Sequence, residues 1–124
     1  MEKNRQKLDT LQLIPKTQSY IEYVIEVIIK LPRTEKFNIG NEYKNSLYQM
    51  LEYILWINKI EGKERLQYFH KIDCQLNMQR IFVRIMYKYR WIDNKKFTVI
   101  MEKISEIGKM LGGLIKYYGK NNTK

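Results

Sequence analysis

The stretch LQYFHKIDCQLNMQRIFVRIM, residues 66–86, decides the fold of this chain. Its apolar residues recur at alternating steps of three and four, and the polar Gln79 fills the one gap in the series. The stripe consists of Leu66, Phe69, Ile72, Leu76, Val83 and Met86. This spacing predicts an α-helix over residues 63–90 with one buried face. Ile81 and Ile85 lie on a neighbouring face, so we expect them to bury a contact between subunits.

The same periodicity continues on both sides of this segment. It predicts three further helices, over residues 17–31, 41–60 and 94–117, joined by short polar links. No obligatory helix breaker follows Pro32, and no alternating strand pattern is bounded by hairpin turns. We therefore predict an all-α fold, an antiparallel up-down four-helix bundle that occupies residues 1–124 as a single domain. Residues 119–124 are expected to form a flexible basic tail.

The composition points to a polyanionic partner. The chain of 124 residues carries 23 Lys and Arg against 13 Asp and Glu, a net charge of +10. Cys74 is the single cysteine, which excludes a disulfide framework and suits a reducing compartment. The N-terminal sequence does not resemble a secretory signal, and no apolar run is long enough for a membrane span. We expect a cytoplasmic protein that has no membrane partner.

Three basic residues in the predicted helix 63–90 define the most informative charged feature. Arg80, Arg84 and Lys88 follow one another at steps of four, and we call them the basic ladder. The simplest interpretation of the basic ladder is a solvated helix face that keeps the protein soluble. A nucleic-acid backbone is the natural partner that would neutralise it, and we extend the predicted contact to Arg90.

Aromatic residues lie beside the basic ladder in the sequence. Tyr87, Tyr89 and Trp91 would stack on unpaired bases if they were exposed, whereas aromatic residues at helical spacing are more often part of a core. The sequence leaves these two alternatives open.

No residue set predicts catalysis or metal binding. His70 has Asp73 and Cys74 three and four positions ahead, but three ligands from one helix do not close a tetrahedral site. Arg65 and His70 match the Arg-x4-His spacing of a class of helical ribonucleases, although the motif lies outside its usual context here. We expect a protein without catalytic residues, metal or cofactor.

The last predicted helix contains a Gly-x-x-x-Gly pattern formed by Gly108 and Gly112, and Gly113 follows directly. Each helical glycine costs about 1 kcal/mol relative to alanine, so a compensating interaction is expected. Close helix packing at Gly108 and Gly112 is the plain explanation, and a helix bend is the second.

Three segments together resemble a known family. They are LPR (residues 31–33), MQRIFVR (78–84) and EIGKMLGGLI (106–115). They look like the accessory variability determinant (Avd) proteins of diversity-generating retroelements, over residues 20–117. The family pattern often places Trp after the final glycine pair, where this chain has Leu114.

The resemblance implies a basic four-helix bundle that assembles as a pentameric barrel. Such a protein binds the element's reverse transcriptase and nucleic acid, RNA or cDNA, during mutagenic retrohoming, and has no catalytic activity of its own. By the same resemblance, Arg80 and Arg84 would contact the nucleic acid or the polymerase. The alternative is the related four-helix protein encoded in intervening sequences of 23S ribosomal RNA genes, with a structural or RNA-binding role. That relative often lacks the paired arginines.

Overall fold

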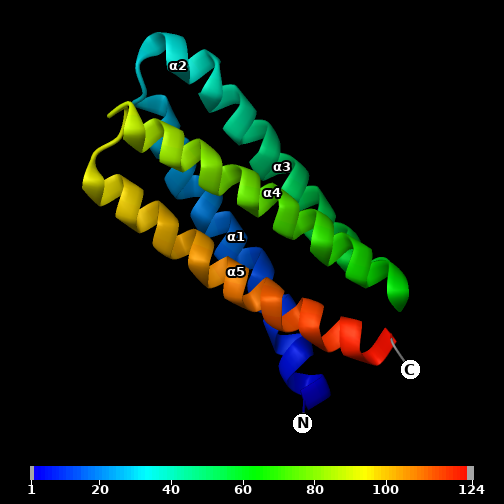
Figure 1. Ribbon diagram of the computed structural model, residues 1–124. Coiled ribbons are helices and arrows are strands. Elements are labelled where there is room, and N and C mark those ends of the chain that lie inside the picture. Colours follow the sequence, from blue (N-terminus) through cyan, green and yellow to red (C-terminus); the bar gives the residue numbers. More distant parts are fainter. Residues whose placement is uncertain (1, 123–124) are drawn as a thin grey trace.

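The computed structural model describes residues 2–122, and the side chains of residues 10–120. Within this range the chain forms four long helices and one short helix, and no strand. They are α1 (Glu2–Ile29), α2 (Arg33–Phe37), α3 (Ile39–Ile57), α4 (Lys63–Lys88) and α5 (Asn94–Asn122). The long helices alternate in direction, and α4 lies between α3 and α5 while α1 packs on both α5 and α3 (Figure 1). The predicted antiparallel four-helix bundle is confirmed.

The N-terminal boundary differs from the prediction. The first helix was expected to begin near Thr17, yet α1 continues through Pro15. Proline is compatible with helical φ, but it lacks an N–H and its ring crowds the carbonyl four residues earlier, so the helix passes through it at a cost of about 3 kcal/mol. Leu13 and Thr17, on either side of Pro15, are both fully buried. Burial of the apolar Leu13 stabilises the helix where the proline weakens it, whereas the Thr17 hydroxyl is buried without a hydrogen-bond partner among the described residues.

Two further boundaries also differ. The expected link between the first two helices contains α2, which packs on α3. Residues 119–122, expected in a flexible tail, instead continue α5, while 123–124 lie outside the described residues.

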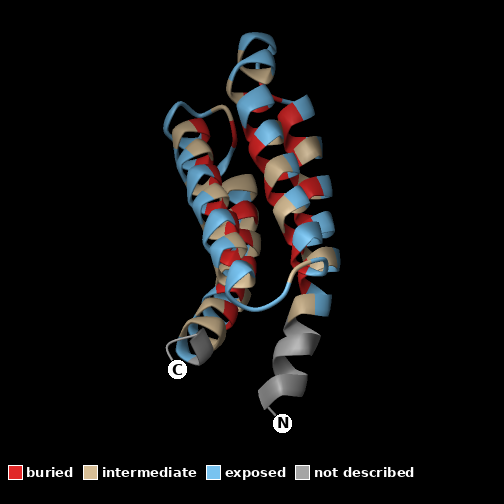
Figure 2. Ribbon diagram, turned by 90° about the vertical axis from the view of Figure 1, so that its right-hand side faces the viewer, coloured by how far each residue is buried: buried red, intermediate tan, exposed pale blue. Residues whose placement is uncertain are grey.

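The core runs along the bundle axis, with buried residues on the inner face of each long helix (Figure 2). The stripe predicted for α4 is confirmed, because five of its apolar members are buried and Leu66 is half-buried. α5 supplies the facing set Ile100, Ile104, Ile107, Leu111 and Leu114. Full burial of such side chains contributes about 1.5–3 kcal/mol each, so this interface supplies much of the folding free energy.

A buried chain of hydrogen bonds, the Gln79 network, crosses this core. Tyr20 OH donates to Gln79 Oε1 at 2.8 Å, and Gln79 Nε2 donates to Ser46 Oγ at 3.0 Å. Ser46 Oγ in turn donates to Gln75 Oε1 at 2.7 Å. Tyr43 OH lies 2.8 Å from Tyr20 OH and is the donor, because the only Tyr20 proton is engaged with Gln79. The network therefore joins α1, α3 and α4.

Burial controls the chemistry of these groups. It raises the pKa of the Tyr20 and Tyr43 hydroxyls above their ordinary value, so both stay neutral hydrogen-bond donors. A buried polar group that loses its partner destabilises the fold strongly. The network consequently disfavours any slip of one helix against its neighbours.

The network predicts unequal effects for two matched substitutions. Tyr20→Phe leaves Gln79 Oε1 and Tyr43 OH without their partners, so the free energy of unfolding should fall by about 1–3 kcal/mol. Tyr43→Phe removes only the outermost donor and should cost less. Urea unfolding followed by circular dichroism measures both. Equal losses would contradict a directional network that runs through Tyr20.

Candidate functional site

The basic ladder begins at Arg80 on the side of α4 that faces α5, and turns toward solvent through Arg84 and Lys88. Arg80 is half-buried, whereas Arg84 and Lys88 are exposed. None of the three forms an ion pair within residues 10–120. Like charges at this helical spacing destabilise a helix by a few tenths of a kcal/mol each, so the ladder is a surface that an anion would stabilise.

Gly108 of α5 makes room for the side chain of Arg80. A Cβ atom at position 108 would lie 2.7 Å from Arg80 Nη2, closer than van der Waals contact allows. On its other side, the guanidinium donates through Nη1 to Asn77 Oδ1. We call this arrangement the Gly108 seat. It holds one guanidinium of the ladder in a defined position, while Arg84 and Lys88 extend into solvent.

The expectation for the two glycines is therefore half right. Gly108 lies at a close approach of α4, since its Cβ would also contact Leu76 Cδ2 at 3.7 Å. The prediction of close packing at Gly112 is wrong within this chain. A Cβ at Gly112 or Gly113 would meet nothing within 4 Å, because both glycines face open space.

Arg90 does not continue the basic ladder along the helix, so the helical geometry behind its predicted contact is wrong, whereas the contact with nucleic acid itself stays a prediction. α4 ends at Lys88, and Arg90 takes the left-handed conformation with φ of 60°. Its N–H donates to Tyr87 O at 3.0 Å, and Trp91 N–H donates to Met86 O at 2.9 Å. These two bonds form a Schellman motif, which closes the helix and carries Arg90 into the turn before α5.

Exposed aromatic rings surround this turn. Tyr87 stacks on Phe97 with ring centroids 4.4 Å apart, and Tyr89 stacks on Trp91 at 5.3 Å. Trp91 is half-buried against the core, while Tyr89 is 59% exposed. The sequence left open whether these aromatic residues belong to the core or are exposed. Trp91 packs against the core, whereas Tyr89 is exposed.

The outer face of α4, opposite the core, is apolar. Ile81 is 53% exposed and Ile85 half-buried. Together with the exposed Cys74 and Met78 they follow steps of four, three and four, and we call these four residues the outer stripe. The predicted interface residues Ile81 and Ile85 therefore lie where a contact outside the chain could cover them.

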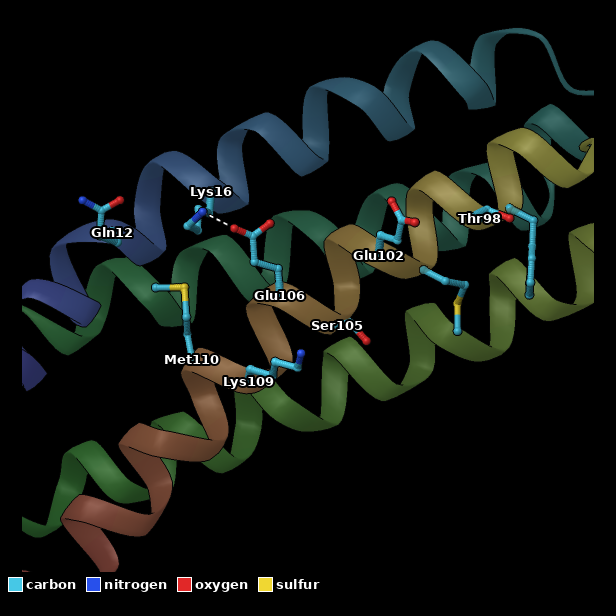
Figure 3. A pocket seen from close by; sticks show the side chains of 10 residues that line it. Gln12, Lys16, Thr98, Glu102, Ser105, Glu106, Lys109 and Met110 are labelled. Carbon is cyan, nitrogen blue, oxygen red and sulfur yellow. Dashed lines mark hydrogen bonds and ion pairs between the residues drawn. The ribbon is translucent and has the colours of Figure 1, made fainter.

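A groove of about 730 Å³ lies along α1 and α5 (Figure 3). Lys16 of α1 pairs with Glu106 of α5, and this hydrogen bond lowers the pKa of the Glu106 carboxyl. The pair makes Glu106 a stable carboxylate, and Glu102 adds a second acidic side chain to the lining. The lining also contains Lys16 and Lys109, so its two cations balance its two carboxylates and the groove does not extend the basic surface.

The residues weighed for catalysis and metal binding lie apart. Arg65 donates to Ile60 O at 2.8 Å and to Tyr118 OH at 3.0 Å, whereas His70 is exposed. Five positions along a helix separate the two by about 140° around its axis, so they do not form a pair. In the part of the chain that the structure describes, no three His, Cys, Asp or Glu side chains come together as metal ligands. No described helix combines the length and hydropathy of a membrane span.

Comparisons with known proteins agree with this architecture. A crystal structure of a protein with unknown function from the S23 ribosomal protein family, from Bacteroides thetaiotaomicron, superposes with a TM-score of 0.79. It is 14% identical in sequence, and the match covers 87% of this chain and 98% of that one. No curated protein matches the sequence. The family model described as bAvd-like matches residues 11–118, nearly the whole chain, and this protein therefore belongs to the bAvd-like family.

Proposed function

We propose that the protein is an accessory subunit of a diversity-generating retroelement. It binds the element's reverse transcriptase and its RNA or cDNA, and so supports mutagenic retrohoming. The family membership supports this proposal. The observation that carries it is the basic ladder, a row of cations on α4 that has no acidic partner among residues 10–120.

The ladder would act by position and charge, without turnover. Arg80 in the Gly108 seat is oriented in advance, so less side-chain entropy is lost when its guanidinium meets a phosphate. Arg84 and Lys88 are long, exposed side chains that can follow a flexible backbone. Phosphate contacts carry no base identity, so we expect little sequence preference and a strong dependence on salt.

Self-association would multiply this surface. The outer stripe lies on the face of α4 opposite the core, whereas Arg80 lies toward α5, so covering the stripe with another copy leaves the Arg80 end of the ladder accessible. We propose a homo-oligomer, a pentameric barrel by the family resemblance, which presents one ladder from each subunit. The assembly is expected to act in the cytoplasm.

The second candidate is a structural or RNA-binding bundle encoded in a 23S ribosomal RNA intervening sequence. The fold-level likeness to a protein from the S23 ribosomal protein family favours it. Co-purification distinguishes the two functions. The accessory subunit should retain a reverse transcriptase encoded beside its own gene, whereas the alternative should retain none and its gene should lie in a ribosomal RNA locus.

Two charge-matched variants test the ladder. Arg84→Ala with Lys88→Ala should lower RNA affinity at least tenfold in low salt, because two phosphate contacts are lost. The slope of log K against log salt should become shallower by about 1.5. Lys59→Ala with Lys63→Ala removes the same charge from exposed positions at the α3–α4 connection, and should change affinity less than twofold. Fluorescence anisotropy at several salt concentrations measures this, and equal losses in the two variants would refute the ladder.

The outer stripe predicts how a second pair of variants should differ in oligomer mass. Ile81→Asp places a carboxylate in the stripe and should dissociate the oligomer to monomers that keep their helical circular dichroism. Leu55→Asp makes the same change on α3 at a position of similar exposure, 49% against 53%. It should leave the oligomer mass unchanged in light scattering. A stripe variant with the wild-type mass would show that subunits meet elsewhere.

A further inference from the structure

The turn between α4 and α5 carries an exposed aromatic side chain that the core does not need. Tyr89 is 59% exposed, although tyrosine rings are usually buried to a large extent in folded proteins. Its neighbour Trp91 packs against the core and closes this end of the bundle. Tyr89 instead adds a large apolar surface in contact with water, which favours a partner that can cover it.

The Tyr89 ring is held in place before any partner arrives. It stacks on Trp91 with an angle of 22° between the ring planes. The Trp91 ring is half-buried against the core, and the backbone N–H of Trp91 donates to Met86 O. A ring that is already ordered loses little conformational entropy when it binds a flat ligand.

The turn holds a non-glycine residue, Arg90, in a strained backbone conformation. Arg90 occupies the left-handed position of the Schellman motif, where glycine is the usual residue because a Cβ atom is disfavoured. A non-glycine residue at such a position points to a site where the side chain itself is used. Here that side chain is a guanidinium beside Tyr89.

The charge around the ring is positive. Lys88 Nζ lies 6.0 Å from the centroid of the Tyr89 ring, and Arg90 follows in the chain. The nearby Asp93 is already engaged, since its Oδ1 accepts from Lys96 N–H at 2.8 Å and its Oδ2 lies 3.9 Å from Lys96 Nζ. An ordered ring with two cations beside it matches a nucleotide, which pairs a flat base with a phosphate.

We propose that this turn is a stacking platform that binds unpaired bases of single-stranded nucleic acid, with a base on Tyr89 and its phosphates at Lys88 and Arg90. The inference rests on the proposed function for the presence of a nucleic acid, and adds that the strand must be unpaired. In a duplex both faces of each base are covered by neighbouring base pairs, so only the backbone could reach the ladder. Stacking on an aromatic side chain is tolerant of base identity.

The test compares a single-stranded 12-nucleotide RNA with a 12-base-pair RNA duplex, both labelled for anisotropy. Tyr89→Leu keeps an apolar side chain but removes the ring, and should weaken single-strand binding about tenfold while changing duplex binding less than twofold. Tyr48→Leu is the matched control, because Tyr48 is 49% exposed on α3, and it should change neither. Arg90→Gly should raise the unfolding temperature and still weaken single-strand binding.

The outcomes separate this inference from the proposed function. If Tyr89→Leu lowers both affinities equally, or neither, while the Arg84→Ala, Lys88→Ala protein binds RNA poorly, the ladder stands and the stacking platform is refuted. If the wild-type protein binds neither RNA, the proposed function fails first. A Tyr89→Leu protein with an unchanged unfolding temperature and a lowered preference for the single strand confirms the platform.

Discussion

The side chain of Gln79 is the constraint on which the arrangement of this molecule depends. It is the one polar residue in the buried stripe of α4, and its amide accepts from Tyr20 of α1 and donates to Ser46 of α3. The network favours one register of the three helices, because a slip would leave these buried groups without their partners. Successive residues of a helix are rotated by about 100°, so once Gln79 points inward Arg80 must point toward α5. The core network thus sets the direction of the basic ladder.

α4 presents a different chemistry on each of its sides. The inner face is core, the opposite face is the outer stripe, and the side toward α5 carries Arg80, where the basic ladder begins. Its C-terminal end runs into a turn of aromatic and cationic residues. Each step of four turns the ladder by about 40° around the helix, so Arg80 stays on the side toward α5 while Lys88 lies next to Ile81 and Ile85 at the edge of the outer stripe. By contrast, the groove along α1 and α5 has two carboxylates in its lining and does not share the cationic character.

Periodicity was enough to predict the four long helices and the buried stripe of α4, because apolar spacing reports directly on which face is covered. Prediction from the sequence failed where packing or backbone conformation overrode the usual preference of a residue. The predicted first helix begins near Thr17, yet α1 continues through Pro15, where the buried Leu13 packs into the core. Arg90 was placed on the helix because nothing in its side chain signals a left-handed backbone. Gly108 and Gly112 look alike in the sequence, and only the structure shows that one faces Arg80 and the other faces solvent.

The central claim is that binding depends on where the ladder holds its charges and not on the net charge of +10 alone. The difference between Gly108 and Gly112 supplies its most direct test. Gly108→Ala changes no charge but places a Cβ 2.7 Å from Arg80 Nη2, so the flexible end of that side chain must move. Gly112→Ala makes the same substitution in open space. Both should maintain or raise stability, since alanine favours helix by up to about 1 kcal/mol. RNA affinity should fall several-fold for Gly108→Ala, remain at the wild-type value for Gly112→Ala, and show no effect of Gly108→Ala when Arg80 is already alanine. Equal, wild-type affinity for both glycine variants would contradict the account and leave net charge as the explanation for binding.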